Sequence, residues 1–70
     1  MPSNMFIARK RLGFTQIQLA RLTGMSQSNY SRIEFGERLI PNNTVRVQLA
    51  EVLKLAPDEV DKPYVGDYFE

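Results

Sequence analysis

The chain has 70 residues, of which 43% are hydrophobic and 24% are charged, and its formal net charge is +1. A chain this short forms one small domain at most, and its apolar content argues against disorder. It contains no cysteine, which excludes a disulfide framework, a cysteine-based zinc site and a thiolate nucleophile. We therefore expect no metal ion and no cofactor, and we expect stability to come from helix packing.

Periodic apolar residues predict a first helix from about Asn4 to Leu12. Met5, Ala8 and Leu12 fall on one stripe, and Gly13 ends the helix. The apolar patch at this end of the chain is too short for a secretory signal, and no run reaches the roughly 18 apolar residues of a membrane span. We therefore expect a cytoplasmic protein that does not associate with membranes.

Two further helix starts follow closely. Thr15 is a good N-cap with Gln18 three residues later, a capping-box pattern that opens a second helix at about 16–23. Gly24 can take the left-handed conformation that ends a helix sharply, and Ser26 is the next N-cap. Two short helices joined by a tight turn that contains glycine form a helix-turn-helix unit.

The third helix, at about 27–35, has two chemically different sides when its residues are placed at intervals of 100°. The polar side, which is free to face outward, consists of Gln27, Ser28, Ser31 and Arg32. The opposite side consists of Tyr30, Ile33 and Glu34. Gly36 ends this helix, and a loop rich in turn-forming residues follows it.

A fourth helix is expected to form the main wall of the core. Thr44 or Asn43 caps it, and it runs to about Leu55. Its apolar stripe consists of Val45, Leu49, Val52, Leu53 and Ala56.

The end of the chain is less regular. Pro57, followed by Asp58 and Glu59, suits the first turn of a short fifth helix, whereas residues 63–70 have no helical period. The sequence therefore predicts an all-α fold, a compact bundle of four to five helices over residues 1–62, with a C-terminal tail after it.

Charge is distributed unevenly along the chain. Six basic residues against two acidic ones give residues 1–38 a net charge of +4, and three against six give residues 39–70 a net charge of −3. This asymmetry favours a molecule with one end that faces a polyanion, although uneven scatter on a small surface would also produce it.

Residues 8–55 carry a set of features in a characteristic order and spacing. They are Arg9, the Gly13-Phe14-Thr15-Gln16 segment, Leu19-Ala20, Gly24, Met25-Ser26, Ile33-Glu34, Gly36, Pro41, Leu49-Ala50 and Leu53. In these features the chain resembles the Cro and phage-repressor class of helix-turn-helix domains, of the xenobiotic-response-element type. The resemblance implies a helix bundle that binds double-stranded DNA, with the third helix in the major groove and the second lying across it near the backbone.

The resemblance also implies roles for individual residues. Base-edge contacts fall on Gln27, Ser28 and Arg32, with Asn29 and Ser31 beside them. Phosphate contacts fall on Gln16 and on the loop residues Arg38, Asn42 and Asn43. These residue types suit the roles, because a Gln amide matches the N6 and N7 edge of adenine and an Arg guanidinium matches the O6 and N7 acceptors of guanine.

Other features of the pattern are structural. Arg9 could reach a phosphate, but the resemblance pairs it with Glu34 as a partly buried ion pair that braces the first and third helices. Tyr30 and Phe14 stand beside basic residues, yet each occupies an apolar helix or entry position, and we expect both in the core.

Several residues depart from the family pattern, among them Ile17 and Gln18, which replace a usual acidic pair, and Asn43, which replaces an apolar residue. Lys54 stands where a glycine is usual, and Phe35 stands where a polar residue usually precedes Gly36. We expect the Phe35 ring to cover the loop residues Leu39 and Ile40, with a thymine methyl or a sugar as its alternative partner.

These features together predict a transcriptional regulator, with repression as the expected output. Catalysis is not expected, since the chain lacks both histidine and cysteine and has no glycine-rich phosphate loop. A protein-interaction module, such as an antitoxin or an antirepressor, is the alternative, and it would use the aromatic and acidic tail to grip a protein.

The expected functional unit is a homodimer on a near-palindromic operator, because one recognition helix reads too few base pairs to single out a genomic site. The candidate dimer interface lies in the C-terminal third, at Leu55, Val60, Tyr64, Val65, Tyr68 and Phe69. A tail that folds back to close its own core is the alternative.

Overall fold

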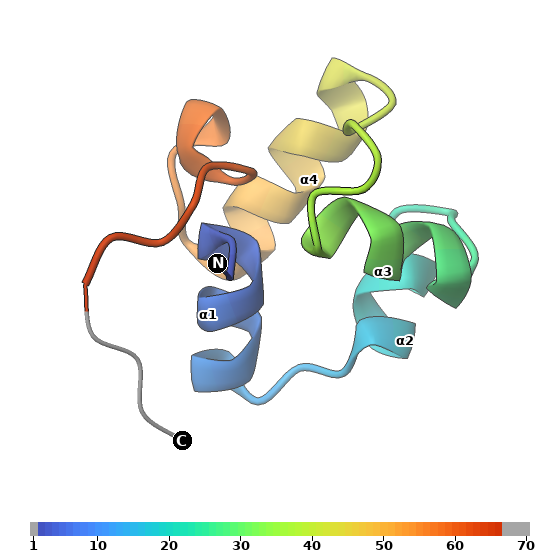
Figure 1. The fold of residues 1–70 in the computed structure, drawn as a ribbon. Helices are drawn as coiled ribbons and strands as arrows, with labels where there is room; N and C mark the ends of the chain where they lie inside the picture. Colours follow the sequence, from blue (N-terminus) through green and yellow to red (C-terminus); the bar gives the residue numbers. More distant parts are fainter. Residues whose placement is uncertain (1, 67–70) are drawn as a thin grey trace.

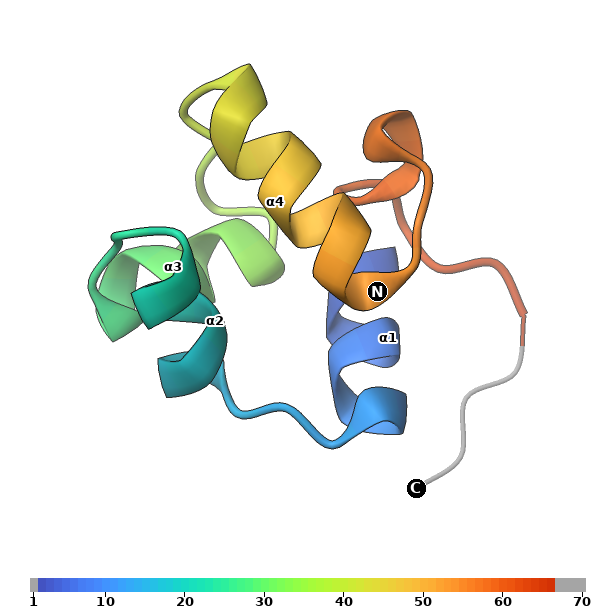
Figure 2. The same cartoon turned by 180° about the vertical axis from the view of Figure 1, so that it is seen from behind.

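A computed structural model of the protein describes residues 2–66, and these form a bundle of α-helices with one 3-10 turn (Figures 1 and 2). In chain order the elements are α1 (Asn4–Leu12), α2 (Gln16–Leu22), α3 (Gln27–Glu34), α4 (Asn43–Leu53) and η1 (Pro57–Glu59). The paired helices α2 and α3 lie on one side of the molecule, and α1 and η1 pack against α4 on the other. The prediction of an all-α bundle is confirmed. None of the helices in this described part is long and apolar enough to cross a membrane.

Local hydrogen bonds set the starts of α2 and α3. Thr15 Oγ1 accepts from the amide of Gln18 at 3.1 Å, and Gln18 Oε1 accepts from the amide of Thr15 at 2.8 Å, so the predicted capping box is present. Ser26 Oγ accepts from the amide of Asn29 at 3.2 Å. Gly24 lies between the two helices with φ +70°, a left-handed conformation that glycine adopts without strain and that reverses the chain. The helix-turn-helix unit predicted from these residues is confirmed.

The start of α4 differs from the prediction. Asn42, and neither Asn43 nor Thr44, caps this helix, because its Oδ1 accepts from the amide of Val45 at 2.9 Å. With this cap, Val45 is buried in the core while Asn43 and Thr44 stay exposed on the first turn.

The end of α4 also comes earlier than expected. Leu53 is its last residue, because Lys54 takes a left-handed conformation with φ 59° and the amide of Leu55 turns back to the carbonyl of Ala50 at 2.9 Å. The predicted fifth helix is a single 3-10 turn, Pro57–Glu59.

Every helix contributes to the core. Its buried residues are Met5, Leu19, Ala20, Tyr30, Ile33, Val45, Leu49, Ala50, Leu53 and Val60. Tyr30 is therefore in the core as predicted, and Phe14 is partly buried and packs against the core. The placement of Val60 in a dimer interface is wrong: the amide of Met5 donates to the carbonyl of Val60 at 3.0 Å, and the Val60 side chain is fully buried.

Helix α1 buries a second face besides the predicted one. Met5 is fully buried, but Leu12, at the end of the expected stripe, is 40% exposed, whereas Ile7 is 1% exposed. Ile7 lines a small hollow of about 220 Å³ together with the end of α4 and Tyr64. The C-terminal segment therefore covers the face of α1 that carries Ile7, which helical periodicity did not predict to be buried.

The two ends of the described chain lie side by side. Ser3 and Pro63 form an isolated antiparallel bridge, and the amide of Tyr64 donates to the carbonyl of Pro2 at 2.9 Å. The C-terminal segment therefore returns to the beginning of α1.

Candidate nucleic-acid interface

Helix α3 presents a polar side to solvent and an apolar side to the core. Gln27, Ser28 and Arg32 are exposed, and Asn29 and Ser31 are half-buried at the edges of that surface. Tyr30, Ile33 and Glu34 are buried on the opposite side. The helix is thus held by one side while the other is available for contacts outside the molecule.

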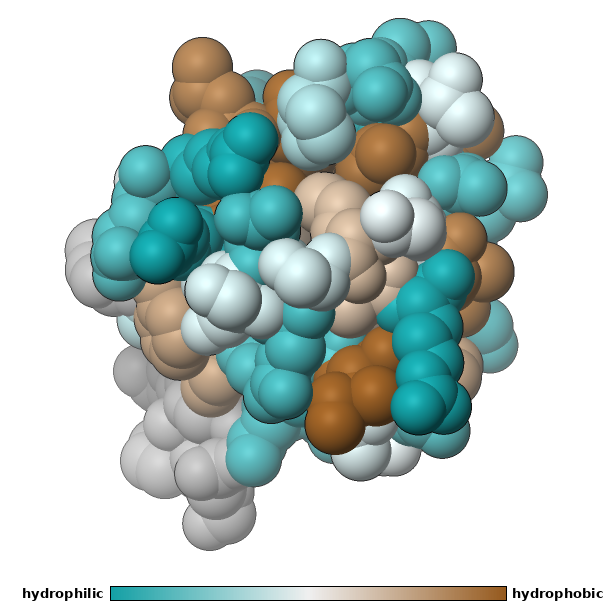
Figure 3. Space-filling view, turned by 90° about the vertical axis from the view of Figure 1, so that its right-hand side faces the viewer, coloured by the Kyte–Doolittle hydropathy of each residue, from teal (hydrophilic) through white to brown (hydrophobic). Residues whose placement is uncertain are grey.

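Figure 3 looks onto the side of the molecule that α2 and α3 form. Hydrophilic and near-neutral residues cover much of the middle of this face, and hydrophobic residues gather near its edges. Three exposed arginines belong to these elements and the loop after them: Arg21 on α2, Arg32 on α3 and Arg38 on the loop. Their positive charge suits a surface that faces a polyanion.

A buried ion pair joins α1 to α3. Arg9 Nε and Nη2 donate to Glu34 Oε2 and Oε1, both at 2.9 Å, and the two side chains are 10% and 0% exposed. Arg9 Nη1 also donates to the carbonyl of Phe14 at 3.0 Å, in the loop that leads to α2. The structure therefore brings together the two residues that the sequence analysis paired, in a fork geometry that only arginine supplies.

Gln16, expected at a phosphate, is held by the same carboxylate. Its Nε2 donates to Glu34 Oε1 at 3.1 Å and to Ser31 Oγ at 3.5 Å. Gln16 also lines an open hollow of about 510 Å³ between the start of α3, at Gln27, and the loop between α1 and α2. A phosphate in this hollow would compete with Glu34 and Ser31 for the amide protons of Gln16.

The loop after α3 carries the other residues expected at phosphates. Arg38 Nη1 donates to Asn29 Oδ1 at 2.8 Å, so it contacts one of the base-reading candidates. Asn42 uses its Oδ1 to cap α4, and Asn43 is exposed on the first turn of that helix. The contact between Arg38 and Asn29 was not predictable from the sequence, because the two residues are nine positions apart and no local pattern joins them.

The Phe35 ring has a partner that the sequence analysis missed. It lies against the ring of Phe6 on α1, with the centroids 6.1 Å apart, and it remains 58% exposed. Leu39, one of the two loop residues expected beneath it, is 82% exposed. The ring therefore helps to join α1 to the end of α3.

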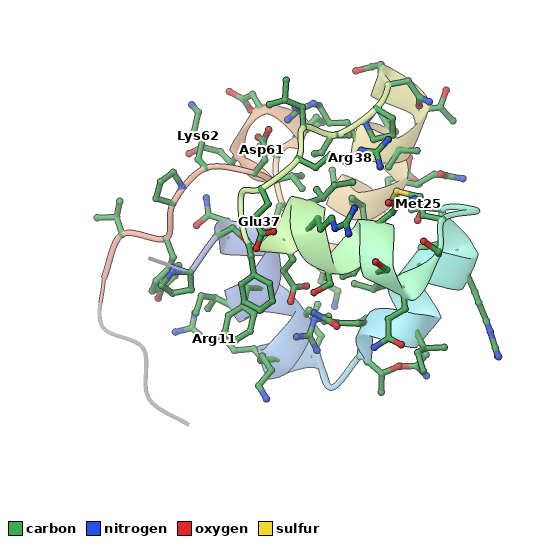
Figure 4. All side chains as sticks on the ribbon, turned by 45° about the vertical axis from the view of Figure 1, so that its right-hand side comes forward. Arg11, Met25, Glu37, Arg38, Asp61 and Lys62 are labelled. Atoms are coloured by element: carbon green, nitrogen blue, oxygen red, sulfur yellow. The ribbon has the colours of Figure 1, made fainter. Side chains whose placement is uncertain are left out.

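The C-terminal segment lies on α1, away from α2. Arg11 Nη2 donates to Tyr64 Oη at 2.9 Å, and the Arg11 guanidinium lies 5.2 Å from the centre of the Tyr64 ring. Figure 4 shows Arg11, Asp61 and Lys62 on this side of the molecule. Arg46 donates to both carboxylate oxygens of Asp61 at 3.0 Å, and this hydrogen bonding lowers the pKa of Asp61.

The remaining candidates for a dimer interface differ in exposure. Leu55 is half-buried against the core, and Val65 is 90% exposed. Tyr68 and Phe69 lie outside the described residues.

Comparison with known proteins agrees with this geometry. The model of the helix-turn-helix family matches residues 7–60, which include most of α1 and every element after it. No curated protein and no solved structure matches the chain. The family match covers more than half of the chain and includes both helices of the turn. The chain therefore belongs to the helix-turn-helix family, in the class of Cro and the phage repressors, and it is a DNA-binding transcription regulator.

Proposed function

We propose that the protein represses transcription by binding a specific operator as a homodimer, with α3 of each protomer in the major groove of one half-site. The exposed polar side of α3 carries this proposal. It projects from a helix whose other side is fixed in the core by Tyr30, Ile33 and Glu34, so its side chains can enter a groove without loss of packing.

The side chains on and beside this surface have the chemistry of base readers. They are Gln27, Ser28, Asn29, Ser31 and Arg32. The Gln27 amide can pair with adenine and the Arg32 guanidinium with guanine, each pairing discriminating by about 1 to 3 kcal/mol against the wrong base. Phosphate contacts at Gln16, Arg38, Asn42 and Asn43 would set the position of the helix on the duplex.

A dimer would read two half-sites one helical turn apart, which makes the operator near-palindromic. The side of the molecule that bears Asp61 and Tyr64 lies away from α2, and residues 39–70 have a net charge of −3 in the sequence, which favours this part of the chain as the contact between protomers rather than with phosphates. Leu55, Tyr64 and Val65 are the described residues proposed for this contact, and Tyr68 and Phe69 would extend it.

The first prediction concerns the base readers. Selection of bound sequences from random duplex DNA gives the operator, and binding to single-base variants of it then measures each preference. Arg32→Ala and Gln27→Ala should each lose about 1 to 3 kcal/mol of specific binding and relax the preference at particular positions, because each removes one base contact. Both residues are exposed, so thermal stability should stay close to that of the wild type.

Gln16→Ala serves as the comparison, because the loss of a residue that contacts a phosphate weakens binding to all sequences about equally. If both α3 variants retained the wild-type base preferences, the assignment of α3 as the reading helix would be wrong. Repression is tested separately, with the selected operator placed over a promoter that drives a reporter. Increased reporter expression with the protein present would show activation instead.

A further inference from the structure

Arg38 and Asn29 form a pair at the edge of the exposed side of α3. Arg38 Nη1 donates to Asn29 Oδ1 at 2.8 Å, so the bond closes the loop onto the first turn of the helix. The backbone of Asn29 is itself fixed, because its amide donates to Ser26 Oγ at 3.2 Å. Arg38 is exposed and Asn29 is half-buried, which leaves the pair accessible from the side that faces outward.

The chemistry of this contact sets the orientation of the Asn29 amide. A guanidinium has five N–H donors and no acceptor, so the group facing it must be the amide oxygen. The amide nitrogen, with its two donors, then points away from Arg38. Positive charge beside the oxygen also polarises the amide, which makes its nitrogen a stronger donor and its oxygen a weaker acceptor.

We infer that Arg38 determines base specificity by positioning Asn29 as a donor, so that the pair selects guanine. This inference rests on the proposed function, in which α3 lies in the major groove. A freely oriented Asn favours adenine, because its oxygen accepts from N6 and its nitrogen donates to N7. With the oxygen held by Arg38, the pair offers N–H groups, which match the two acceptors of guanine and oppose the N6 amino group of adenine.

A role of Arg38 at a phosphate alone leads to a different expectation. The loss of a phosphate contact weakens binding to all sequences alike and leaves each base preference in place. The loss of a positioning contact changes the preferred base at one position, the position read by Asn29. The two roles are therefore separable by the pattern of base preferences rather than by affinity.

The experiment measures base preference across the selected operator for the full chain, for Arg38→Ala, for Asn29→Ala and for the double variant. The wild type should prefer guanine at one position where Asn29→Ala has no preference. Arg38→Ala should shift that position to adenine, with a change in the ratio of the two affinities of roughly 5- to 150-fold. In the Asn29→Ala background, Arg38→Ala should leave the base preference at that position unaltered. Arg21→Ala is the matched control, because it removes an exposed arginine from α2 and should weaken binding without moving any preference.

The outcomes separate this inference from the proposed function. If the wild type enriches no sequence, the proposed function fails, and this inference fails with it. If the wild type enriches an operator but Arg38→Ala lowers binding to all sequences equally, only the inference is overturned. It is likewise overturned if no guanine preference depends on Asn29. Thermal melts of each variant ensure that the comparison is made between folded proteins.

Discussion

The Glu34 side chain accepts hydrogen bonds from two other helices. Its carboxylate receives the fork of Arg9 from α1 and the amide of Gln16 from α2, and its backbone carbonyl receives Ser3 Oγ at 2.9 Å. A fully desolvated carboxylate is tolerated only when such partners surround it. Glu34 thus fixes the relative positions of the helices that carry the proposed interface.

The second prediction is that Glu34→Gln and Arg9→Met each lower the free energy of unfolding by about 3 to 5 kcal/mol, because each leaves one buried group without its partner. Urea denaturation measures the change. Arg32→Met is the control, since it removes an exposed arginine from the same helix as Glu34 and should have little effect on stability. Wild-type stability in either Glu34→Gln or Arg9→Met would show that the pair contributes little.

The third prediction concerns the Tyr30 hydroxyl, which is buried and has no hydrogen-bond partner among the described residues. Burial, and to a smaller extent the nearby Glu34 carboxylate, raises the pKa of Tyr30, so the hydroxyl stays neutral. Tyr30→Phe should therefore leave the free energy of unfolding unchanged or raise it by up to about 1 kcal/mol, because it removes an unpaired polar group. Tyr30→Ala, by contrast, should cost about 3 to 5 kcal/mol through the cavity it leaves. A clear loss in Tyr30→Phe, measured by thermal melting, would indicate a partner for the hydroxyl in solution.

At the scale of elements, the end of α4 places a lysine in a conformation that suits glycine. Lys54 has φ 59°, a left-handed conformation that costs a residue with a Cβ about 1 kcal/mol. The fourth prediction is that Lys54→Gly raises the free energy of unfolding by about 0.5 to 1 kcal/mol. Lys54→Ala keeps the Cβ and should give no such gain. Urea denaturation of both variants checks this, and equal effects of the two would mean that the gain comes from the loss of the lysine side chain.

The start of a helix was predictable where the sequence offers only one N-cap candidate. The capping box of Thr15 and Gln18 and the cap at Ser26 are each written within four residues, so the starts of α2 and α3 agree with the structure. Three consecutive residues from Asn42 onward can all cap a helix, and the burial of Val45 decides among them. That decision depends on the tertiary core and could not be made from the sequence.

The contacts of the proposed interface were predictable only in part. The two sides of α3 follow from helical periodicity, and the Arg9–Glu34 pair came from the family resemblance rather than from spacing. The contact of Arg38 with Asn29 and that of Phe6 with Phe35 join separate elements, so only the folded structure brings them together.

At the scale of the whole molecule, the C-terminal segment stabilises the fold through its contacts with α1, and we propose that it also contributes to the dimer. Tyr64 is bound to Arg11, whereas Val65 is almost fully exposed. The fifth prediction is that a chain ending at Asp61 melts at a lower temperature than the full chain and no longer dimerises on operator DNA, because it loses the Lys62 and Tyr64 contacts with the start of the chain and the apolar residues proposed for the dimer. Calorimetry and sedimentation measure the two effects.

Arg11→Ala separates these two effects, since it removes the hydrogen bond to Tyr64 Oη but keeps the backbone bond of Tyr64 to Pro2 and the whole C-terminal segment. This variant should be less stable than the wild type and still dimeric. If the full and the shortened chain dimerised equally, or if both remained monomeric on the operator, the tail would have no part in the dimer.

The pairing of α1 with the C-terminal segment also has a consequence for synthesis. The first amides of α1, those of Asn4 and Met5, donate to the carbonyls of Lys62 and Val60 at 2.9 and 3.0 Å. Helix α1 is translated before either of these acceptors. Since domains fold as units, the nascent chain cannot complete its core until Lys62 has emerged from the exit tunnel. The bundle that holds α3 rigid is therefore completed only after synthesis has passed Lys62, and a nascent chain stalled before that point would not yet bind an operator.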